Sequence, residues 1–130
     1  MRTNRNLYKR LGAALVVCAC VGTATARAEE DAATRANRSA YNALIKCFVA
    51  NGLASDERSK AGDSEKAAAY NAKARQSFDY AYVAGEKIGL NDKQVARDLS
   101  FVQDTELPKM IRDRQYFFSA AATCKALGLM

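Results

Sequence analysis

Residues 40–48, with the sequence AYNALIKCF, decide the fold of this chain. Their apolar side chains recur at intervals of three and four residues, which places them on one face of an α-helix. This face consists of Ala40, Tyr41, Leu44, Ile45, Cys47 and Phe48. The stretch therefore predicts a helix whose buried side carries a cysteine.

The predicted helix extends over residues 31–61. Glu29, Glu30 and Asp31 suit the positive end of its dipole. Gly52 offers a point at which this helix could end, with Ser55 capping a second one. We favour a single helix that is weakened at Gly52.

Glycine-containing turns at 62–63 and 89–90 and a cap at Asp113 divide the rest of the chain into three further predicted helices, over residues 64–88, 92–111 and 114–127. Asn91 and Asp113 are suited to cap the last two helices, and the glycines at 89 and 128 are suited to end helices. Pro108 lacks a backbone N–H and clashes with the carbonyl four residues back, so a kink or break is expected near Asp104.

Each of these helices has one apolar face. The inner faces are predicted to carry Ala67, Tyr70, Ala74, Phe78, Ala81, Tyr82 and Ile88 in the first, Val95, Leu99 and Val102 in the second, and Phe117, Ala120, Ala121, Cys124 and Leu127 in the third. Short connections favour antiparallel neighbours. The sequence predicts an all-α fold, a small antiparallel bundle of about four helices.

The first 28 residues have the pattern of a bacterial-type signal peptide. Basic residues (Arg2, Arg5, Lys9 and Arg10) precede an apolar run over 11–21, which is too short for a confident membrane span. Small residues at Ala26 and Ala28 predict cleavage between Ala28 and Glu29. Residues 29–130 then form a single helical domain in the periplasm or outside the cell. A minor alternative is a lipoprotein anchored at Cys20, because Val17-Cys18-Ala19-Cys20 resembles a lipoprotein box.

Cys47 and Cys124 are the cysteines that remain after this cleavage. In an oxidising compartment two cysteines most simply form one disulfide, which here would join the first helix to the last. The alternative is a pair of unlinked core cysteines. Closing so long a loop is worth roughly 4–5 kcal/mol, less any strain.

The net charge of +6 comes mostly from the predicted signal peptide. Without its five basic residues, 15 basic residues face 14 acidic ones, a net charge of +1. The high isoelectric point therefore does not support a nucleic-acid partner.

The segment 62–74, GDSEKAAAYNAKA, resembles the turn and second helix of a tetratricopeptide repeat. Gly62, Asp63, Ala67, Tyr70 and Ala74 stand where that family has its turn, its packing alanines and an aromatic. The preceding helix lacks the family's pattern, and no second copy follows, although such repeats need about three stacked units. We interpret the segment as a tight helical hairpin and carry over no ligand residues.

The chain contains no histidine, which excludes Ser-His-Asp and Cys-His catalysis and histidine-ligated zinc. No nucleophile motif, phosphate-binding loop or metal-site spacing is present, so we expect neither an enzyme nor a cofactor. Asp56, Glu57, Asp104 and Glu106 are interpreted as solvated helix residues.

Tyr80 and Val83 lie off the predicted inner face of helix 64–88. They indicate either a central helix with two apolar sides or a contact surface for a protein partner, which Tyr116 and Phe118 could extend. We expect an exported protein that binds another macromolecule, as a periplasmic accessory or chaperone-like factor. The alternatives are an inhibitor or immunity protein against a periplasmic toxin or cell-wall enzyme and, third, an enzyme of unrecognised type.

Overall fold

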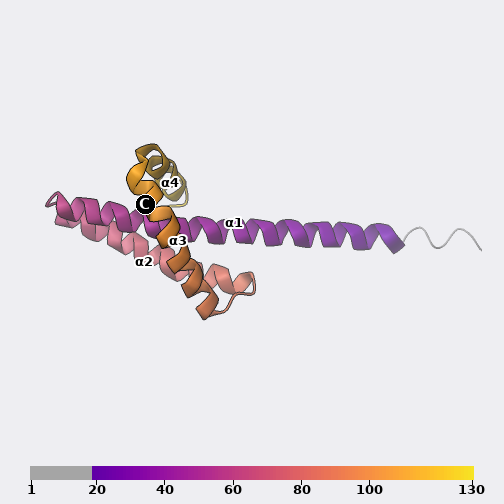
Figure 1. Ribbon diagram of the computed structural model, residues 1–130. Helices are drawn as coiled ribbons and strands as arrows, with labels where there is room; N and C mark the ends of the chain where they lie inside the picture. Colours follow the sequence, from indigo (N-terminus) through magenta and orange to yellow (C-terminus); the bar gives the residue numbers. More distant parts are fainter. Residues whose placement is uncertain (1–18) are drawn as a thin grey trace, which may run out of the picture. The chain divides into compact units, whose positions relative to one another are not determined.

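A computed structural model describes residues 19–130, with side chains from residue 32 onward. The chain divides into two compact units, residues 1–34 and residues 35–130. The described residues form four α-helices, which are α1 (Ala19–Lys60), α2 (Ser64–Lys87), α3 (Asp92–Arg112) and α4 (Arg114–Ala126) (Figure 1). The predicted all-α class is confirmed.

Helix α1 begins at Ala19 instead of residue 31, so the predicted start is wrong. Residues 19–36 are rich in alanine and free of proline, and this high helix propensity continues the helix upstream. The acids at 29–31 therefore lie inside the helix. The single helix through Gly52 is confirmed. Residues 1–18, which carry most of the predicted signal peptide, lie outside the described residues, so cleavage after Ala28 and lipidation of Cys20 stay predictions.

The glycine-ended helices have a common backbone geometry. Gly62, Gly89 and Gly128 adopt φ values of 77°, 81° and 69°, in the left-handed region that glycine tolerates. After Gly89, the N–H of Leu90 donates to the carbonyl of Gly85 over 2.9 Å, as a Schellman motif requires. These turns reverse the chain within a few residues and bring successive helices together.

The predicted caps are also present. Asn91 and Gln94 form a reciprocal capping box at the start of α3. The Asp113 carboxylate accepts from the N–H groups of Gln115 and Tyr116 at the start of α4, over 2.9 and 3.2 Å. Pro108 does not break α3, because buried side chains on both sides of it pack into the core and outweigh one missing backbone hydrogen bond.

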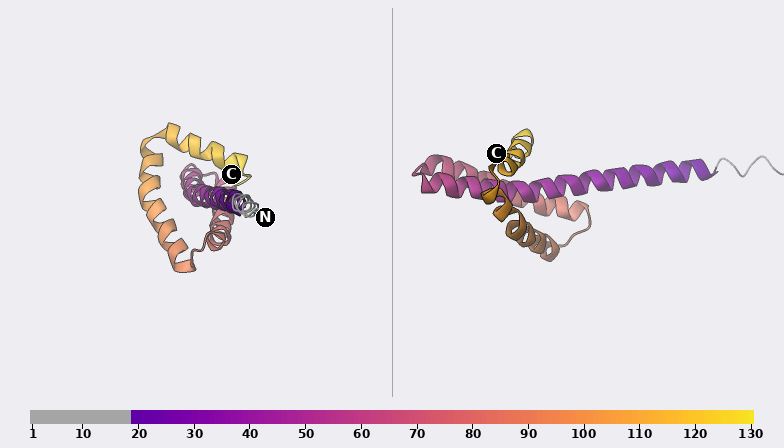
Figure 2. Two further views of the ribbon diagram at one scale, coloured as in Figure 1. Left: turned by 90° about the vertical axis from the view of Figure 1, so that its right-hand side faces the viewer. Right: turned by 45° about the horizontal axis from the view of Figure 1, so that its top comes forward.

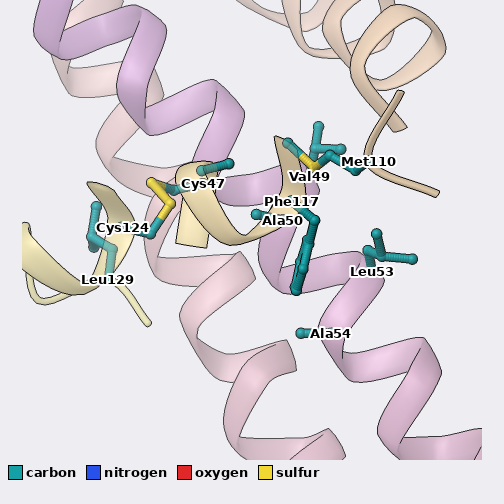
Figure 3. Packing of buried hydrophobic residues seen from close by; sticks show 10 residues of the cluster. Cys47, Val49, Ala50, Leu53, Ala54, Met110, Phe117, Cys124 and Leu129 are labelled. Carbon is teal, nitrogen blue, oxygen red and sulfur yellow. A yellow bond between two sulfur atoms is a disulfide. The ribbon is translucent and has the colours of Figure 1, made fainter. Parts of the chain in front are cut away.

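Two clusters of buried side chains form the core. The first joins α1, α3 and α4 (Figure 3) and contains Cys47, Val49, Ala50, Leu53, Ala54, Met110, Phe117, Ala120, Cys124 and Leu129. The second joins α1, α2 and α3 and contains Tyr41, Ile45, Ala81, Val95 and Leu99. Helices α1 and α3 contribute to both clusters and connect them.

Leu127 was expected in the core, but its side chain is 52% exposed, and this prediction is wrong. The chain reverses at Gly128, and Leu129 is buried instead. A leucine that follows the left-handed glycine folds back onto its helix, whereas the residue before the glycine stays outside.

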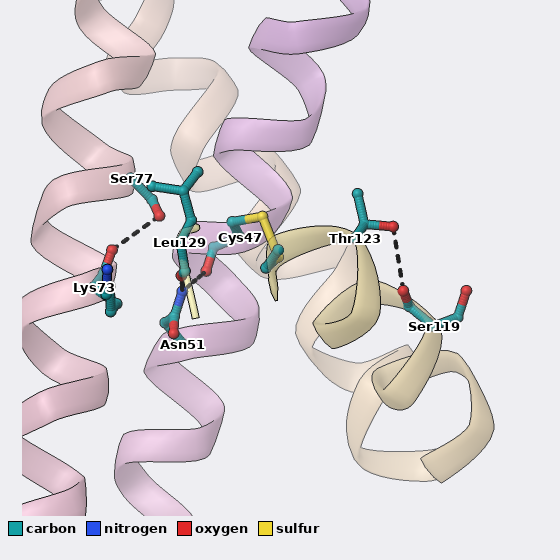
Figure 4. Close-up of a disulfide and its surroundings, with 8 residues drawn as sticks. Cys47, Asn51, Lys73, Ser77, Ser119, Thr123 and Leu129 are labelled. Atoms are coloured by element: carbon teal, nitrogen blue, oxygen red, sulfur yellow. Dashed lines mark hydrogen bonds between the residues drawn. A yellow bond between two sulfur atoms is a disulfide. The ribbon is translucent and has the colours of Figure 1, made fainter. Parts of the chain in front are cut away.

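The predicted disulfide is confirmed. Cys47 of α1 and Cys124 of α4 are both buried and bonded, with Cα atoms 5.5 Å apart and a sequence separation of 77 residues. Beside it, Nδ2 of buried Asn51 donates to the carbonyls of Cys47 and Leu129, over 2.9 and 2.6 Å (Figure 4). The end of α4 and the chain that follows it are thus held to the middle of α1.

Within residues 35–130, α2 turns back along α1, while α3 and α4 cross this pair obliquely (Figures 1 and 2). The antiparallel arrangement is therefore not confirmed for α3 and α4. The crossing leaves parts of α1 and α2 uncovered, and the candidate site lies there.

Candidate protein-binding surface

Helix α2 packs into the fold through small residues. Its buried positions are Ala67, Ala74, Ser77, Ala81 and Gly85. A Cβ atom placed on Gly85 would lie 2.5 Å from Cγ2 of Val95 and 3.3 Å from the Tyr41 ring. Because the inward side chains are so small, the backbone of α2 approaches its neighbours closely, and the larger side chains lie at its flanks or outside.

Phe78 shows the effect of this close approach. It was predicted on the inner face of α2, but it is 37% exposed. Its ring lies 5.8 Å from that of Phe48 and 5.0 Å from that of Tyr82, measured between centroids. The prediction placed this large aromatic side chain on the buried face of α2. Small residues, mainly alanines and Ser77, occupy that face and leave Phe78 at its edge.

Tyr80 and Val83 are the large apolar side chains on the outer side of α2. They are 49% and 53% exposed. The Tyr80 hydroxyl accepts a hydrogen bond from Nε2 of Gln76 over 3.1 Å, which orients the ring along the helix. An ordered aromatic with a free face is a common anchor in protein interfaces.

Two shallow grooves adjoin at Tyr80. One, of about 330 Å³, runs between α1 and α2 and is lined by Asn37, Ala40, Leu44, Tyr80, Val83, Ala84 and Lys87. The other reaches the chain after α4 and is lined by Ala36, Ser39, Ala40, Ala43, Leu44, Tyr80, Thr123, Leu127 and Leu129. We call the residues that line these two grooves the Tyr80 surface.

The Tyr80 surface is mostly apolar and carries one charge. Lys87 is the only charged residue among its members, and it forms no ion pair with a described residue. Lys87 and Leu127 were not among the residues predicted for a contact surface. The signal for Lys87 was its spacing, because a residue four positions after Val83 lies on the same side of a helix.

Tyr116 and Phe118 do not line these grooves, so the structure does not extend the Tyr80 surface to them. Phe118 is exposed and lies 5.7 Å from the Phe117 ring, with the Arg114 guanidinium 5.3 Å from its centroid. Tyr116 is half-buried and belongs to a polar cluster with Glu106 and Lys46.

The polar cluster joins three helices. Glu106 of α3 accepts hydrogen bonds from the Tyr116 hydroxyl of α4 and, over 2.8 Å, from the Lys109 ammonium. The Lys46 ammonium of α1 lies 3.4 Å from the same carboxylate and donates to the Tyr116 hydroxyl over 3.0 Å. We call Lys46, Glu106, Lys109 and Tyr116 the three-helix cluster.

The three-helix cluster shifts two pKa values. Burial by itself would raise the pKa of Glu106, but hydrogen bonds from Lys109 and Tyr116 and the charges of Lys46 and Lys109 lower this pKa to about 2. The hydrogen bond to Tyr116 raises the pKa of Lys46 above its ordinary value. Two ammonium groups face the Glu106 carboxylate, whose side chain is 13% exposed, so Glu106 is a paired structural carboxylate and not a solvated helix residue as predicted.

The acidic residues Asp56, Glu57 and Asp104 are also paired or exposed. Asp56 forms an ion pair with Lys60 at 2.6 Å, and Glu57 forms one with Arg114 at 2.5 Å. Asp104 is exposed. Among the described residues, no three His, Cys, Asp or Glu side chains gather where they could hold a metal ion.

No described helix combines the length and apolar character needed to cross a membrane. Comparison of the chain with protein-family models, with characterised proteins and with solved structures finds no match.

Proposed function

We propose that the protein acts by binding a protein partner through the Tyr80 surface. The observation that carries this proposal is the exposure of Tyr80 and Val83 beside two adjoining apolar grooves. Singly exposed apolar residues are ordinary on protein surfaces, but a contiguous apolar area with an aromatic anchor is typical of an interaction site.

The dimensions of the surface suit a helix of the partner. On α1 it spans residues 36–44, a length of about 12 Å at the usual rise per residue. That length matches about two helical turns, and the alanines on its floor allow a close approach. Lys87, at one end, favours a partner that carries an acidic side chain there.

The proposal includes export from the cytoplasm. The signal-peptide pattern of residues 1–28 supports it, and the Cys47–Cys124 disulfide supports it independently, because such bonds persist in oxidising compartments. A periplasmic accessory or chaperone-like factor is the class that fits a small stapled domain with a binding surface and no recognised catalytic motif.

The test separates binding from folding. Tyr80→Ala is expected to weaken recovery of the partner with the tagged protein, by about thirtyfold in affinity if Tyr80 is a hot spot worth about 2 kcal/mol. The free energy of unfolding should change by less than about 0.5 kcal/mol, because the side chain lies outside the core. Both are measured on the same preparation, by quantitative pull-down and by chemical denaturation.

Phe101→Ala is the matched control, because Phe101 is an exposed aromatic on α3 that lies outside the Tyr80 surface. It should leave partner recovery unchanged. If Tyr80→Ala unfolds the protein, Tyr80 belongs to the core of a central helix. If it changes neither quantity, the contact surface lies elsewhere, and the proposal is wrong.

A further inference from the structure

One row of side chains on α2 has an arrangement of charge that the Tyr80 surface alone does not explain. Asp79, Val83 and Lys87 are spaced by four residues, so they lie in one row along the helix. All three are exposed. Neither Asp79 nor Lys87 forms an ion pair with a described residue.

The two charged residues of this row lie at equal distances from its apolar centre and have opposite signs. Asp79 lies four residues before Val83, and Lys87 lies four residues after it. A two-fold axis that passes through Val83 and pairs two copies of α2 antiparallel would place Asp79 of each copy opposite Lys87 of the other. The same axis would place the Tyr80 hydroxyl of each copy opposite the Glu86 carboxylate of the other, as donor and acceptor.

From this self-complementarity we infer that α2 is a self-association surface, and that its occupant is a second copy of this chain. The inference rests on the proposed function, since it names a partner for the face that carries Tyr80 and Val83. A two-fold contact uses the same patch of both copies, so each charged side chain must face a side chain of opposite charge from the other copy. A contact with an unrelated partner places no such requirement on the row.

The shape of α2 around Val83 allows the contact. Val83 lines the groove between α1 and α2. It also lines a further groove, outside the Tyr80 surface, toward the start of α3, so it lies between the two. Rows of side chains four residues apart pack against one another in the commonest helix-pair geometry. The buried small-residue positions of α2 lie on its opposite side and keep the helix fixed.

The expected dimer is weak and sensitive to salt. A contact made by one helix face and the adjoining groove lies at the low end of interface sizes. We therefore expect dissociation in the micromolar range or weaker, and further weakening when salt screens the two exposed ion pairs.

Sedimentation equilibrium of the purified protein, in the form that the cell accumulates, tests the inference by charge reversal. Asp79→Lys or Lys87→Asp alone turns both expected ion pairs into repulsive contacts, and each is expected to weaken self-association by about tenfold or more. The double variant Asp79→Lys with Lys87→Asp rebuilds both pairs with opposite polarity. It should restore the dissociation constant to within about threefold of the original.

Arg97→Asp is the control for Lys87→Asp, because it makes the same charge change on an exposed residue of α3 outside the row. It should leave the dissociation constant unchanged. A protein that stays monomeric at about 1 mM, or a double variant as weak as the single ones, would overturn the inference.

A photo-crosslinking residue at position 80 distinguishes this failure from a failure of the proposed function. Crosslinks of twice the chain mass support the second copy. Crosslinks only to a different protein, from a monomeric chain, overturn the second copy and leave the proposed function standing. No crosslink to any protein overturns both.

Discussion

Two glycines inside helices have opposite surroundings. A Cβ atom added to Gly52 would meet no heavy atom within 4 Å, so this position is open. A Cβ atom added to Gly85 would lie 2.5 Å from Cγ2 of Val95, a stiff and buried side chain. Glycine is therefore required by packing at one position and not at the other.

We predict that the same substitution has opposite effects at these positions. Gly52→Ala should raise the free energy of unfolding by about 0.5–1 kcal/mol, because alanine favours the helix and nothing obstructs it. Gly85→Ala gains the same propensity, but it must displace Val95 and the Tyr41 ring, so it should lower that free energy by about 1–3 kcal/mol. Urea denaturation of both variants measures the two changes, and equal effects would contradict the packing of α2 against α3.

At the level of the helices, the three-helix cluster adds polar contacts between α1, α3 and α4, the helices that the first core cluster also joins. Glu106 is the centre of this cluster, and its side chain is 13% exposed. Its pKa falls from an ordinary value of 4.5 to about 2. The folded state therefore stabilises the ionised carboxylate of Glu106 relative to the unfolded chain. The contribution to stability is therefore complete above about pH 4.5 and is lost as the pH falls toward 2.

We predict an acid-dependent loss of stability that depends on this residue. Between pH 6 and pH 2, the original protein should lose up to about 3 kcal/mol of unfolding free energy through Glu106. Glu106→Gln should be less stable at pH 6 and should lose correspondingly less on acidification. Glu65→Gln, at an exposed position of α2, is the control and should keep the original pH dependence. Denaturant unfolding at both pH values measures the difference.

At the level of the whole molecule, the Cys47–Cys124 disulfide connects α1 to α4 across the first core cluster. The chain after α4 is held nearby, because the carbonyls of Gly128 and Leu129 accept hydrogen bonds from Lys73 and Asn51. The last part of the chain is thus attached to both α1 and α2. Loss of the disulfide should loosen this attachment as well as the core.

We predict that the double variant Cys47→Ser with Cys124→Ser loses roughly 4 kcal/mol of stability, because a crosslink that closes a 77-residue loop strongly restricts the unfolded chain. A loss of that size is a large part of a small domain's stability, so the melting temperature should fall by many degrees. Thermal unfolding measured with and without reductant checks this. Two reactive thiols in unfolded, unreduced protein would show that the bond does not form.

Local patterns predicted much of this fold because their physical causes are local. The spacing of Leu44, Ile45 and Cys47 determines a helix face, and the carboxylate of Asp113 and the left-handed backbone of Gly89 determine helix ends within a few residues. The start of α1 was missed because the predicted signal segment was treated as separate from the helix that it continues. At the candidate site, the sequence indicated Tyr80 and Val83 but did not place them beside α1.

The sequence by itself determined the helices, their caps and the two cysteines available for a bond. The helices depend on periodicity, the caps depend on turn chemistry, and the bond depends on there being two cysteines after the predicted cleavage. The tertiary structure alone decided which face of α2 is buried, because that depends on how closely its backbone approaches Tyr41 and Val95. It also decided that Tyr116 joins Glu106 and Lys46 and does not extend the Tyr80 surface. Contacts between residues far apart in the chain depend on how helices cross, and the periodicity of a single helix carries no information about its crossing partners.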